Sequence, residues 1–404
     1  PPYHYQYIYM YIHIHNKGGV SRCRDRLRQT ETQGATAAMS VGPFLVSWGI
    51  RFPLSFAIVL ANLYAAGTSL VTAVSNTTAL LGLSENPPTL DVPSVLALWI
   101  GFVFLTGTAF YIVPLFAFHF IFPARNLAKY YGCKWALVTG ASSGIGAAIS
   151  TRLAQQGINV VLVALEDALL EKHTLMLRER FPNQEFRAVG VDLTREGYLE
   201  KVRDATEDIS INVVFNNAGY LLLGGFTKKP LGAHLGNLEC NVISGLKITH
   251  LIMSRMVESG VTKGAFFFTS SSASLFPAPA QSMYSSGKSF ISSFAASLAI
   301  EASLKGYDIL SIQPGPMRTN FYTQNVSGSV PKLDAFKFFL AMSNTPEEVA
   351  EILFRAAGRC TWLDTGVFSF VMRIIMRLVD VNAFVSLMKN TIHLSGDMKK
   401  QDLL

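Results

Sequence analysis

The sequence predicts an α/β protein with a doubly wound parallel sheet, preceded by a helical transmembrane anchor. Three observations carry this prediction. From residue 134 onward, short apolar runs alternate with helical segments, which is typical of a parallel sheet with helical crossovers. A glycine-rich turn directly follows the first of these runs. Upstream of it, two long stretches without charged residues are each long enough to cross a bilayer.

Six short apolar runs are the predicted strands: Trp135–Val138, Val160–Val163, Phe186–Val191, Val213–Phe215, Ala265–Thr269 and Ile309–Ile312. In an open parallel sheet, ligands bind at the carboxyl ends of the strands. Most of the glycine and polar motifs of this chain directly follow one of the runs, so we expect one ligand site at that edge. Residues 345–357 predict a helix. The apolar segment 368–390 predicts another, which fits a membrane surface, a pocket cover, or a buried or dimer-forming helix.

The turn after the first predicted strand reads TGASSGIG and leads into a helix. Glycines here let the backbone approach a pyrophosphate, and the start of the helix presents free N–H groups and a positive dipole end. A glycine trio alone is weak evidence, but the strand before it and the helix after it are the required context. The residues expected to hold the pyrophosphate are Gly140, Ser142, Ser143, Gly144, Ile145 and Gly146.

The run YSSGK places Tyr284 and Lys288 four residues apart, and therefore on one face of a helix. A free tyrosine titrates at about pH 10, and we expect the neighbouring ammonium to lower its pKa. Such a phenol can donate a proton to a carbonyl oxygen that is receiving a hydride. Ser271 follows another predicted strand and is expected to bind the same oxygen from the opposite side.

These motifs are joined, in order, by NNAG at residues 216–219, by Asn241 and by QPGPMRT at residues 313–319. Over residues 134–321 the chain resembles the short-chain dehydrogenase/reductase family, and the resemblance implies a Rossmann-type fold. The segments LECN and SLFPAPAQSMYSSGKSF are similar to the membrane-bound branch of that family, which contains very-long-chain 3-oxoacyl-CoA reductases and 17-beta-hydroxysteroid dehydrogenases.

The resemblance implies roles for further residues. It implies that Asn241 holds a water linking Lys288 to solvent, although an ordinary helix hydrogen bond is an alternative. It implies that Asp192 contacts the adenine, although a helix cap is an alternative and both can hold. Besides Tyr284 and Lys288, the other implied contacts to the dinucleotide are Asn217, Ala218, Gly219, Pro314, Gly315 and Thr319.

The choice between NAD and NADP depends on the end of the second strand, where an acid favours NAD and an arginine favours NADP. Members of the membrane-bound branch that this chain resembles usually have an arginine at this position. This chain has Ala164 and Leu165 instead, followed by Glu166 and Asp167, which would repel a phosphate. Reduction of long acyl chains argues for NADPH, so we expect NADPH to be favoured over NAD by a small margin.

The apolar stretches 52–83 and 95–122 are the predicted spans, and the loop between them lacks lysine and arginine. Basic residues flank the pair on both sides, which indicates a hairpin with both flanks in the cytosol. A single span is the alternative. The predicted division is an N-terminal extension without regular structure (1–42), a membrane anchor (43–129), an NAD(P)-binding catalytic domain (130–335) and a C-terminal helical region associated with substrate or membrane (336–404).

The composition agrees with membrane association, since 50% of residues are hydrophobic, 15% are charged and the mean hydropathy is +0.31. The four cysteines have no metal-ligand spacing, which argues against a metal site and against a disulfide framework. The net charge of +7 is dispersed, without a basic stripe that carries aromatic residues, which argues against nucleic acid as a partner.

These observations predict a membrane-anchored, NAD(P)H-dependent reductase of a lipid carbonyl. The expected reaction is 3-oxoacyl-CoA to 3-hydroxyacyl-CoA in very-long-chain fatty acid elongation, at the endoplasmic reticulum membrane with the catalytic domain in the cytosol. A 17-beta-hydroxysteroid or retinoid dehydrogenase is one alternative, and a catalytically idle cofactor-binding scaffold is another. The expected partners are a long-chain acyl-CoA or steroid-like substrate and the membrane, with a homodimer left open.

Overall fold

The computed structural model describes residues 92–317 and 343–391. The chain divides into two compact units, residues 1–98 and 99–404, and the second contains the whole sheet. Three predicted features lie outside the described residues: the extension 1–42, the first apolar stretch 52–83 and Thr319.

Seven parallel strands form one sheet in the order β3-β2-β1-β4-β5-β6-β7, which confirms the predicted doubly wound fold. The strands β1 and β4 are buried throughout, because helices cover both faces of the sheet. The strand order reverses beside β1, whose neighbours are β2 and β4, and ligands bind such sheets at this switch point. The strands are β1 (Trp135–Thr139), β2 (Asn159–Ala164), β3 (Phe186–Gly190), β4 (Ile211–Asn216), β5 (Gly264–Thr269), β6 (Tyr307–Pro314) and β7 (Trp362–Thr365).

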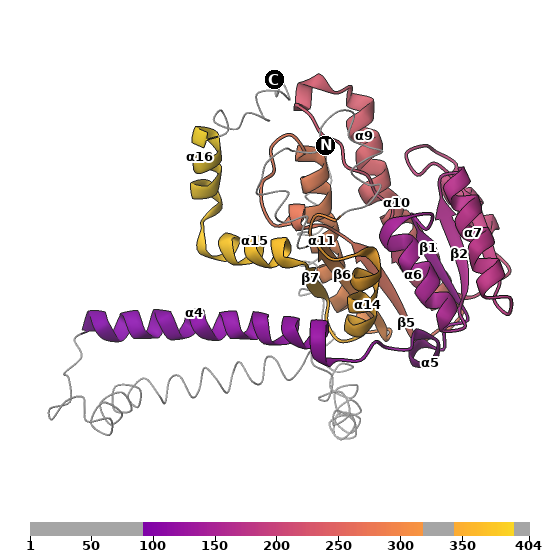
Figure 1. The fold of residues 1–404 in the computed structure, drawn as a ribbon, viewed down its shortest axis with the longest axis horizontal. Coiled ribbons are helices and arrows are strands. Elements are labelled where there is room, and N and C mark those ends of the chain that lie inside the picture. The colour runs from indigo at the N-terminus through magenta and orange to yellow at the C-terminus, as the bar shows by residue number, and fades with distance from the viewer. Residues whose placement is uncertain (1–91, 318–342, 392–404) are drawn as a thin grey trace, which may run out of the picture. The chain divides into compact units, whose positions relative to one another are not determined.

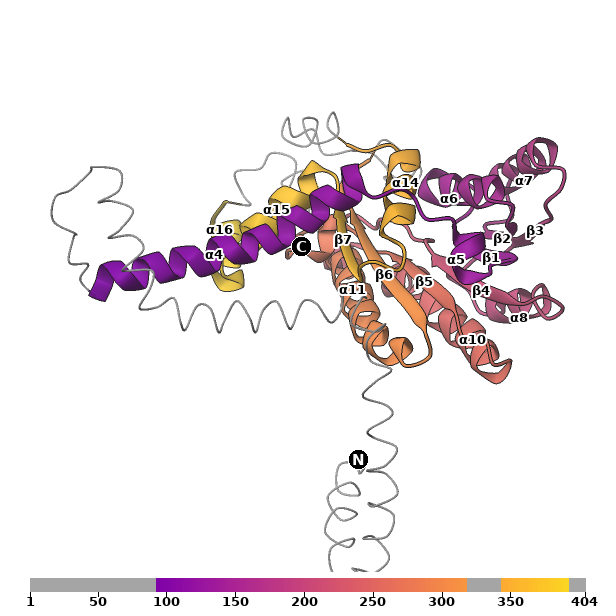
Figure 2. The same ribbon diagram turned by 90° about the horizontal axis from the view of Figure 1, so that it is seen from below.

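Three helices cover each face of the sheet, and each layer has its own apolar core (Figures 1 and 2). On one face the rings of Phe215, Phe267 and Phe354 stack, with centroids 4.5 and 6.0 Å apart. That face carries α6 (Gly144–Gln155), α7 (Ala168–Arg180) and α14 (Pro346–Ala356), and the other carries α8 (Tyr198–Asp204), α10 (Ser244–Glu258) and α11 (Ser282–Ser303). The short helix α5 (Leu127–Tyr131) precedes β1.

The seventh strand was absent from the prediction. It reads WLDT, which is short and half polar, so it lacks the pattern of a buried strand. It nevertheless pairs with β6, and α14 before it packs into the core beside α6. The predicted helix at 345–357 is α14, and Thr345 and Glu348 form its capping box. The segment expected to be a separate C-terminal region therefore supplies one strand and one helix to the main domain.

The apolar segment 368–390 forms two helices where the pattern predicts one. These are α15 (Val367–Leu378) and α16 (Val381–Thr391). Val379 between them is extended, and the Asp380 carboxylate accepts hydrogen bonds from the backbone N–H groups of Asn382 (2.8 Å) and Ala383 (3.4 Å). Asp380 thus caps α16, and the apolar segment therefore forms two helices although its apolar residues predict one.

The second predicted span is the helix α4 (Val92–Phe116), continued by a π-helical turn, η2 (Ala117–Ile121). Within 92–317 and 343–391, one helix is long and apolar enough to cross a membrane, over Gly101–Ile121, and only 6% of this stretch is buried. A core helix of a soluble protein would be mostly buried, so α4 fits an anchor upstream of the catalytic fold.

Candidate active site

The glycine-rich turn joins β1 to α6 and closes onto the end of β4. Gly140 and Gly144 have φ angles of +65° and +54°, which favour glycine. A Cβ on Gly140 would lie 2.9 Å from the Ala218 Cα, and a Cβ on Gly146 would clash with the Gly140 carbonyl oxygen. Internal packing therefore requires these glycines in addition to any approach of a pyrophosphate. Ser143 stands at the N-cap of α6, but its side chain caps no backbone N–H, which leaves the start of the helix open to an anion.

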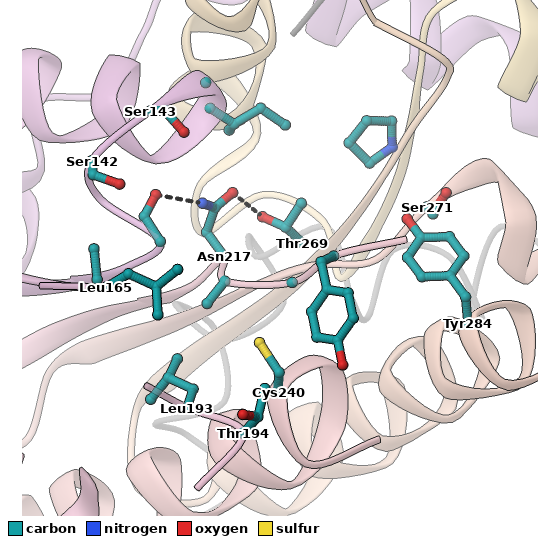
Figure 3. Close-up of a pocket in the computed structure, with 18 of the residues that line it drawn as sticks. Ser142, Ser143, Leu165, Leu193, Thr194, Asn217, Cys240, Thr269, Ser271 and Tyr284 are labelled. Atoms are coloured by element: carbon teal, nitrogen blue, oxygen red, sulfur yellow. Dashed lines mark hydrogen bonds between the residues drawn. The ribbon is translucent and has the colours of Figure 1, made fainter. Parts of the chain in front are cut away.

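A hydrogen-bond network ties the ends of three strands together beneath this turn, and Figure 3 shows its bond between Asn217 and Thr269. The Thr139 hydroxyl accepts from the backbone N–H groups of Asn217 (2.9 Å) and Ala218 (3.0 Å). The Asn217 amide donates to the Thr139 carbonyl (3.2 Å) and accepts from the Thr269 hydroxyl (3.0 Å). Thr139 opens the TGASSGIG motif, whereas Thr269 lies in none of the motifs. The signal that marks them is their place as the last residue of β1 and of the predicted fifth strand.

Of the three residues that directly follow β2, two line the cavity and one is held elsewhere. Leu165 is 55% exposed and lines the cavity together with Asp167. The Asp167 carboxylate caps α7 by accepting from the backbone N–H groups of Leu169 (3.1 Å) and Leu170 (3.0 Å). Glu166 packs over Gly190, where an added Cβ would come within 2.8 Å of it, and it does not line the cavity. Of the two acids expected to repel a phosphate, only Asp167 is placed to do so.

Asp192 follows β3 and lines the same end of the cavity. Its carboxylate accepts from the backbone N–H (2.9 Å) and the hydroxyl (2.7 Å) of Thr194, and forms an ion pair with Arg195 at 3.2 Å. The helix α8 begins only at Tyr198, with Gly197 at its N-cap. The alternative role of Asp192 as a cap of that helix is therefore wrong, because the carboxylate closes a local turn instead.

The three central polar residues of the prediction meet at the other end of the cavity. Ser271 is extended after β5 and accepts from the Ala273 backbone N–H at 3.2 Å. Tyr284, in the first turn of α11, is hydrogen-bonded to the Ser271 side chain, and Figure 3 shows the two side chains facing each other. Lys288 lies one turn farther on, and its ammonium donates to the Thr269 carbonyl at 2.8 Å.

A buried polar chain that the motifs do not reveal holds α11 against the sheet. The Ser270 hydroxyl donates to the Lys288 carbonyl (2.7 Å) and contacts the Ser292 hydroxyl (2.8 Å). The Gln313 amide donates to Ser292 (3.2 Å) and Ser311 (2.9 Å). These contacts fix the rotation of α11 and hence the direction of the Tyr284 and Lys288 side chains.

Burial controls the titration of this pair. It raises the pKa of Tyr284 to about 12, although the hydrogen bond from Ser271 acts in the opposite direction. It lowers the pKa of Lys288 to about 8. The prediction that Lys288 lowers the pKa of Tyr284 is therefore wrong when only the side chains of the protein act on the two groups. The physical reason is that the ammonium lies 5.6 Å from the centroid of the Tyr284 ring and is bound to the Thr269 carbonyl, while both groups are buried.

Asn241 lies behind the cavity wall in a π-helical turn, η4 (Glu239–Ile243), between α9 (Leu231–Leu238) and α10. Its amide donates to the carbonyls of Tyr220 (2.9 Å) and Asn237 (3.0 Å). Its buried Oδ1 atom accepts no hydrogen bond from the described residues. A Cβ on Gly219 would clash with this oxygen and lie 3.2 Å from the Lys288 ammonium nitrogen, so the glycine separates two polar groups. Single π turns of this kind are frequent at functional sites.

One cavity of about 430 Å³ joins these groups, from the Ser142–Ser143 turn and Leu165 at one end to Ser271 and Tyr284 at the other (Figure 3). Gly146 packs beneath the turn and Asn241 behind Gly219, so neither lines the cavity. The predicted residues that line it are Gly140, Ser142, Ser143, Gly144, Ile145, Asp192, Asn217, Ala218, Gly219, Ser271, Tyr284, Lys288, Pro314 and Gly315. Cys240 of LECN, Met317 of QPGPMRT and Leu193 line it as well, although none of the three is among the predicted site residues.

Residues 134–329 match the family model of the short chain dehydrogenases. This segment belongs to the short-chain dehydrogenase family. Mouse 17-beta-hydroxysteroid dehydrogenase type 3 is 33% identical to it over 46% of this chain and 61% of the relative. The very-long-chain 3-oxoacyl-CoA reductase of Macaca fascicularis is 31% identical over 45% of this chain and 58% of the relative.

The chain thus matches about 60% of the length of these curated relatives. A solved structure of a 7beta-hydroxysteroid dehydrogenase shares the short-chain dehydrogenase fold, with 26% identity and a TM-score of 0.54, and the match covers 63% of this chain and all of that one. The resemblance drawn from the motifs is confirmed at the level of the family.

The residues present fit a nicotinamide dinucleotide, which the fold of this family binds. The open start of α6 and the tight glycine turn suit the pyrophosphate. Asp167, Leu165 and Asp192 line the end where the adenosine would lie, and Pro314 and Gly315 line the end near Tyr284.

Proposed function

We propose that this chain is a membrane-anchored, NAD(P)H-dependent reductase of a lipid carbonyl. The observation that carries the proposal is the convergence of Ser271, Tyr284 and Lys288 at one end of a cavity whose other end is a pyrophosphate-type turn. A bound dinucleotide supplies the hydride. The reading as an idle scaffold is disfavoured because all three polar groups are present and in reach of one another.

The raised pKa of Tyr284 suits a proton donor, because the phenol is protonated near neutral pH. We assign to Tyr284 the donation of its hydroxyl proton to the substrate oxygen, and to Ser271 a hydrogen bond to that same oxygen. Lys288, with its pKa near 8, still carries a proton at pH 7 and stabilises the phenolate that remains. Asn241 Oδ1 and the Lys288 ammonium flank Gly219, which supports a water between them as the route for reprotonation.

For the substrate, we propose a 3-oxoacyl-CoA of a very long chain. The proposal is supported by the relatives named as such reductases and by the apolar anchor α4. A steroid is the second candidate, favoured by the relatives named as 17-beta-hydroxysteroid dehydrogenase. The test is an assay of the detergent-solubilised full chain with NADH and NADPH against 3-oxoacyl-CoA, 17-ketosteroid and retinal, with Tyr284→Phe as the blank. Turnover of the steroid alone would replace the acyl-CoA proposal, and no turnover of any carbonyl would contradict both.

For the dinucleotide, we propose weak discrimination, with NADPH as the expected reductant. The cavity-lining residues that come shortly after β2 are Leu165, Asp167 and Leu169, which include no cation, and Asp167 disfavours a 2′-phosphate. The Leu165→Arg variant should improve kcat/KM for NADPH about tenfold or more, a change that corresponds to about 1.4 kcal/mol, because arginine offers a planar donor fork to phosphate. NADH kinetics should change little.

The matched control for this change is Leu175→Arg, which adds the same charge at a half-exposed leucine of α7, away from the cavity. Steady-state kinetics with both dinucleotides measure the effect. Equal gains for NADH and NADPH in Leu165→Arg would show that residue 165 does not face the 2′ position.

For the location, we propose the endoplasmic reticulum membrane with the catalytic domain in the cytosol. Arg125, Lys129 and Lys134 follow α4, and basic residues mark the cytosolic side of a span. Protease added to sealed microsomes should remove a tag placed after Leu404 and should digest the domain without detergent. Immunoblotting measures the loss of the tag. Protection of the tag until detergent is added would indicate a luminal domain and contradict this topology.

A further inference from the structure

The helix α15 turns its polar side chains toward the protein. Ser369, Arg373 and Arg377 are spaced four residues apart and share one face. The Ser369 hydroxyl is buried and donates to the Gln313 carbonyl at 2.8 Å. The Arg373 guanidinium binds both carboxylate oxygens of Asp364, at 2.8 and 2.9 Å. Every charged side chain of α15 is therefore on the face that carries these internal contacts.

The opposite side of α15 is apolar instead, and α16 exposes apolar side chains among polar ones. On α15, Ile375 is 36% exposed and Leu378 is 61% exposed, and on α16, Val381 and Leu387 are 49% and 58% exposed. A surface helix of a soluble protein has the opposite arrangement, with charged groups outward and the apolar stripe on the core. Apolar side chains exposed opposite the polar face of α15 favour contact with another apolar phase or molecule.

The position of α15 beside α4 indicates that the apolar side chains of α15 contact the bilayer. Tyr111 of α4 donates to the Asp364 carboxylate at 2.9 Å, and its ring stacks on Phe370 of α15 with centroids 6.0 Å apart. The Arg377 guanidinium lies over the same tyrosine ring, 4.5 Å from its centroid. The helix α4 has an almost unburied apolar surface of its own, which includes Leu105 at 67% and Val113 at 63% exposure.

The stretch that is long and apolar enough to cross a bilayer, Gly101–Ile121, contains Tyr111, so the contact with Tyr111 places α15 beside this stretch. Tyrosine favours the boundary between hydrocarbon and head groups. Arg373 is bound to Asp364, so the exposed Arg377 beside Tyr111 is the guanidinium of α15 that can meet lipid phosphate.

We propose that α15 lies in the interface of the bilayer that α4 crosses, with Ile375 and Leu378 among the acyl chains. The inference rests on the proposed membrane anchor and is independent of the proposed substrate. It also connects the membrane to the active site, because Phe368 and Ser369 at the start of α15 lie 3.5 Å from the position of a Cβ on Gly315. A second copy of this chain is the competing occupant of the apolar face.

The experiment uses the wild-type full chain in vesicles of phosphatidylcholine and phosphatidylserine that contain a phospholipid with a diazirine in its acyl chain. After illumination and proteolysis, mass spectrometry should find the label on peptides from α4 and α15. The peptide of α7 that contains the exposed Leu175 serves as the internal control and should stay unlabelled. Label on α4 without label on α15 would overturn the inference, whereas absence of label from both would refute the anchor itself.

A variant gives the second measurement. Ile375→Asp together with Leu378→Asp should remove most of the label from α15 and leave that of α4 unchanged, while Leu175→Asp should change neither. If α15 becomes labelled only when the chains are diluted in lipid, and a cross-linker joins two copies through α15 before dilution, the face belongs to a dimer and the proposal is overturned.

Discussion

Replacement of Tyr284 by phenylalanine is expected to lower kcat of carbonyl reduction by about 10²–10⁴-fold, the range for loss of a general acid. The ring fills the same buried volume, so the packing around α11 should persist. What disappears is the hydroxyl that is hydrogen-bonded to Ser271. Dinucleotide affinity, measured by quenching of protein fluorescence, should stay within a few-fold of wild type, because the glycine turn is untouched.

The matched control is Tyr220→Phe, which removes from the same cavity a phenol that is hydrogen-bonded to Asn237. Its kcat should fall far less than that of Tyr284→Phe. Turnover of Tyr284→Phe within a few-fold of wild type would exclude this residue as the proton donor, whatever the substrate proves to be.

Replacement of Arg373 by alanine is expected to lower the free energy of unfolding by about 3–5 kcal/mol, the cost of leaving a buried charge without its partner. The Asp364 side chain is only 1% exposed, and Arg373 satisfies both of its oxygens. Tyr111 donates one further hydrogen bond to that carboxylate but carries no positive charge. Denaturant unfolding of the full chain in detergent, followed by circular dichroism, measures the change.

The control is Arg187→Ala, which breaks the exposed ion pair of Arg187 with Asp208, whose side chain is 63% exposed. Surface pairs contribute about 0–1 kcal/mol, so this variant should be close to wild type. The double variant Arg373→Met with Asp364→Asn should recover part of the lost stability, because no charge then remains buried. If Arg373→Ala and Arg187→Ala lowered the free energy of unfolding by the same amount, Asp364 would not be the buried carboxylate that the structure shows.

Much of the catalytic cavity was accessible from local patterns. The glycine turn, Ser271, and the Tyr284 and Lys288 pair each follow a strand or lie one helical turn apart, and such spacing determines geometry directly. The residues that support them were not accessible in this way. Thr139 and Gln313 open the TGASSGIG and QPGPMRT motifs, and Ser292 lies in no motif. The hydrogen bonds of all three join strands and helices distant in sequence, and the motifs do not indicate these partners.

The electrostatic prediction failed for a related reason. Spacing places Lys288 beside Tyr284 but says nothing about where the ammonium points or how deeply both groups are buried. Burial raises the pKa of the tyrosine and lowers that of the lysine, and the lysine donates to the Thr269 carbonyl. Likewise, Glu166 and Asp167 are adjacent in sequence, yet one packs over Gly190 and the other caps α7 at the cavity wall.

The sequence by itself determined the doubly wound sheet, the family, the edge of the sheet that holds the cavity, and an apolar helix before the domain. These depend on periodicity and on turn chemistry, which are local properties of the chain. Only the tertiary structure decided that WLDT completes the sheet, that Asp380 divides the last apolar segment, and that the polar face of α15 is turned inward. The strand β7 depends on β6, about fifty residues away, and such a pairing leaves no periodic trace in the chain. Asp380 and Arg373 have partners two to nine residues away, but the apolar periodicity of the segment does not show which way these polar side chains turn.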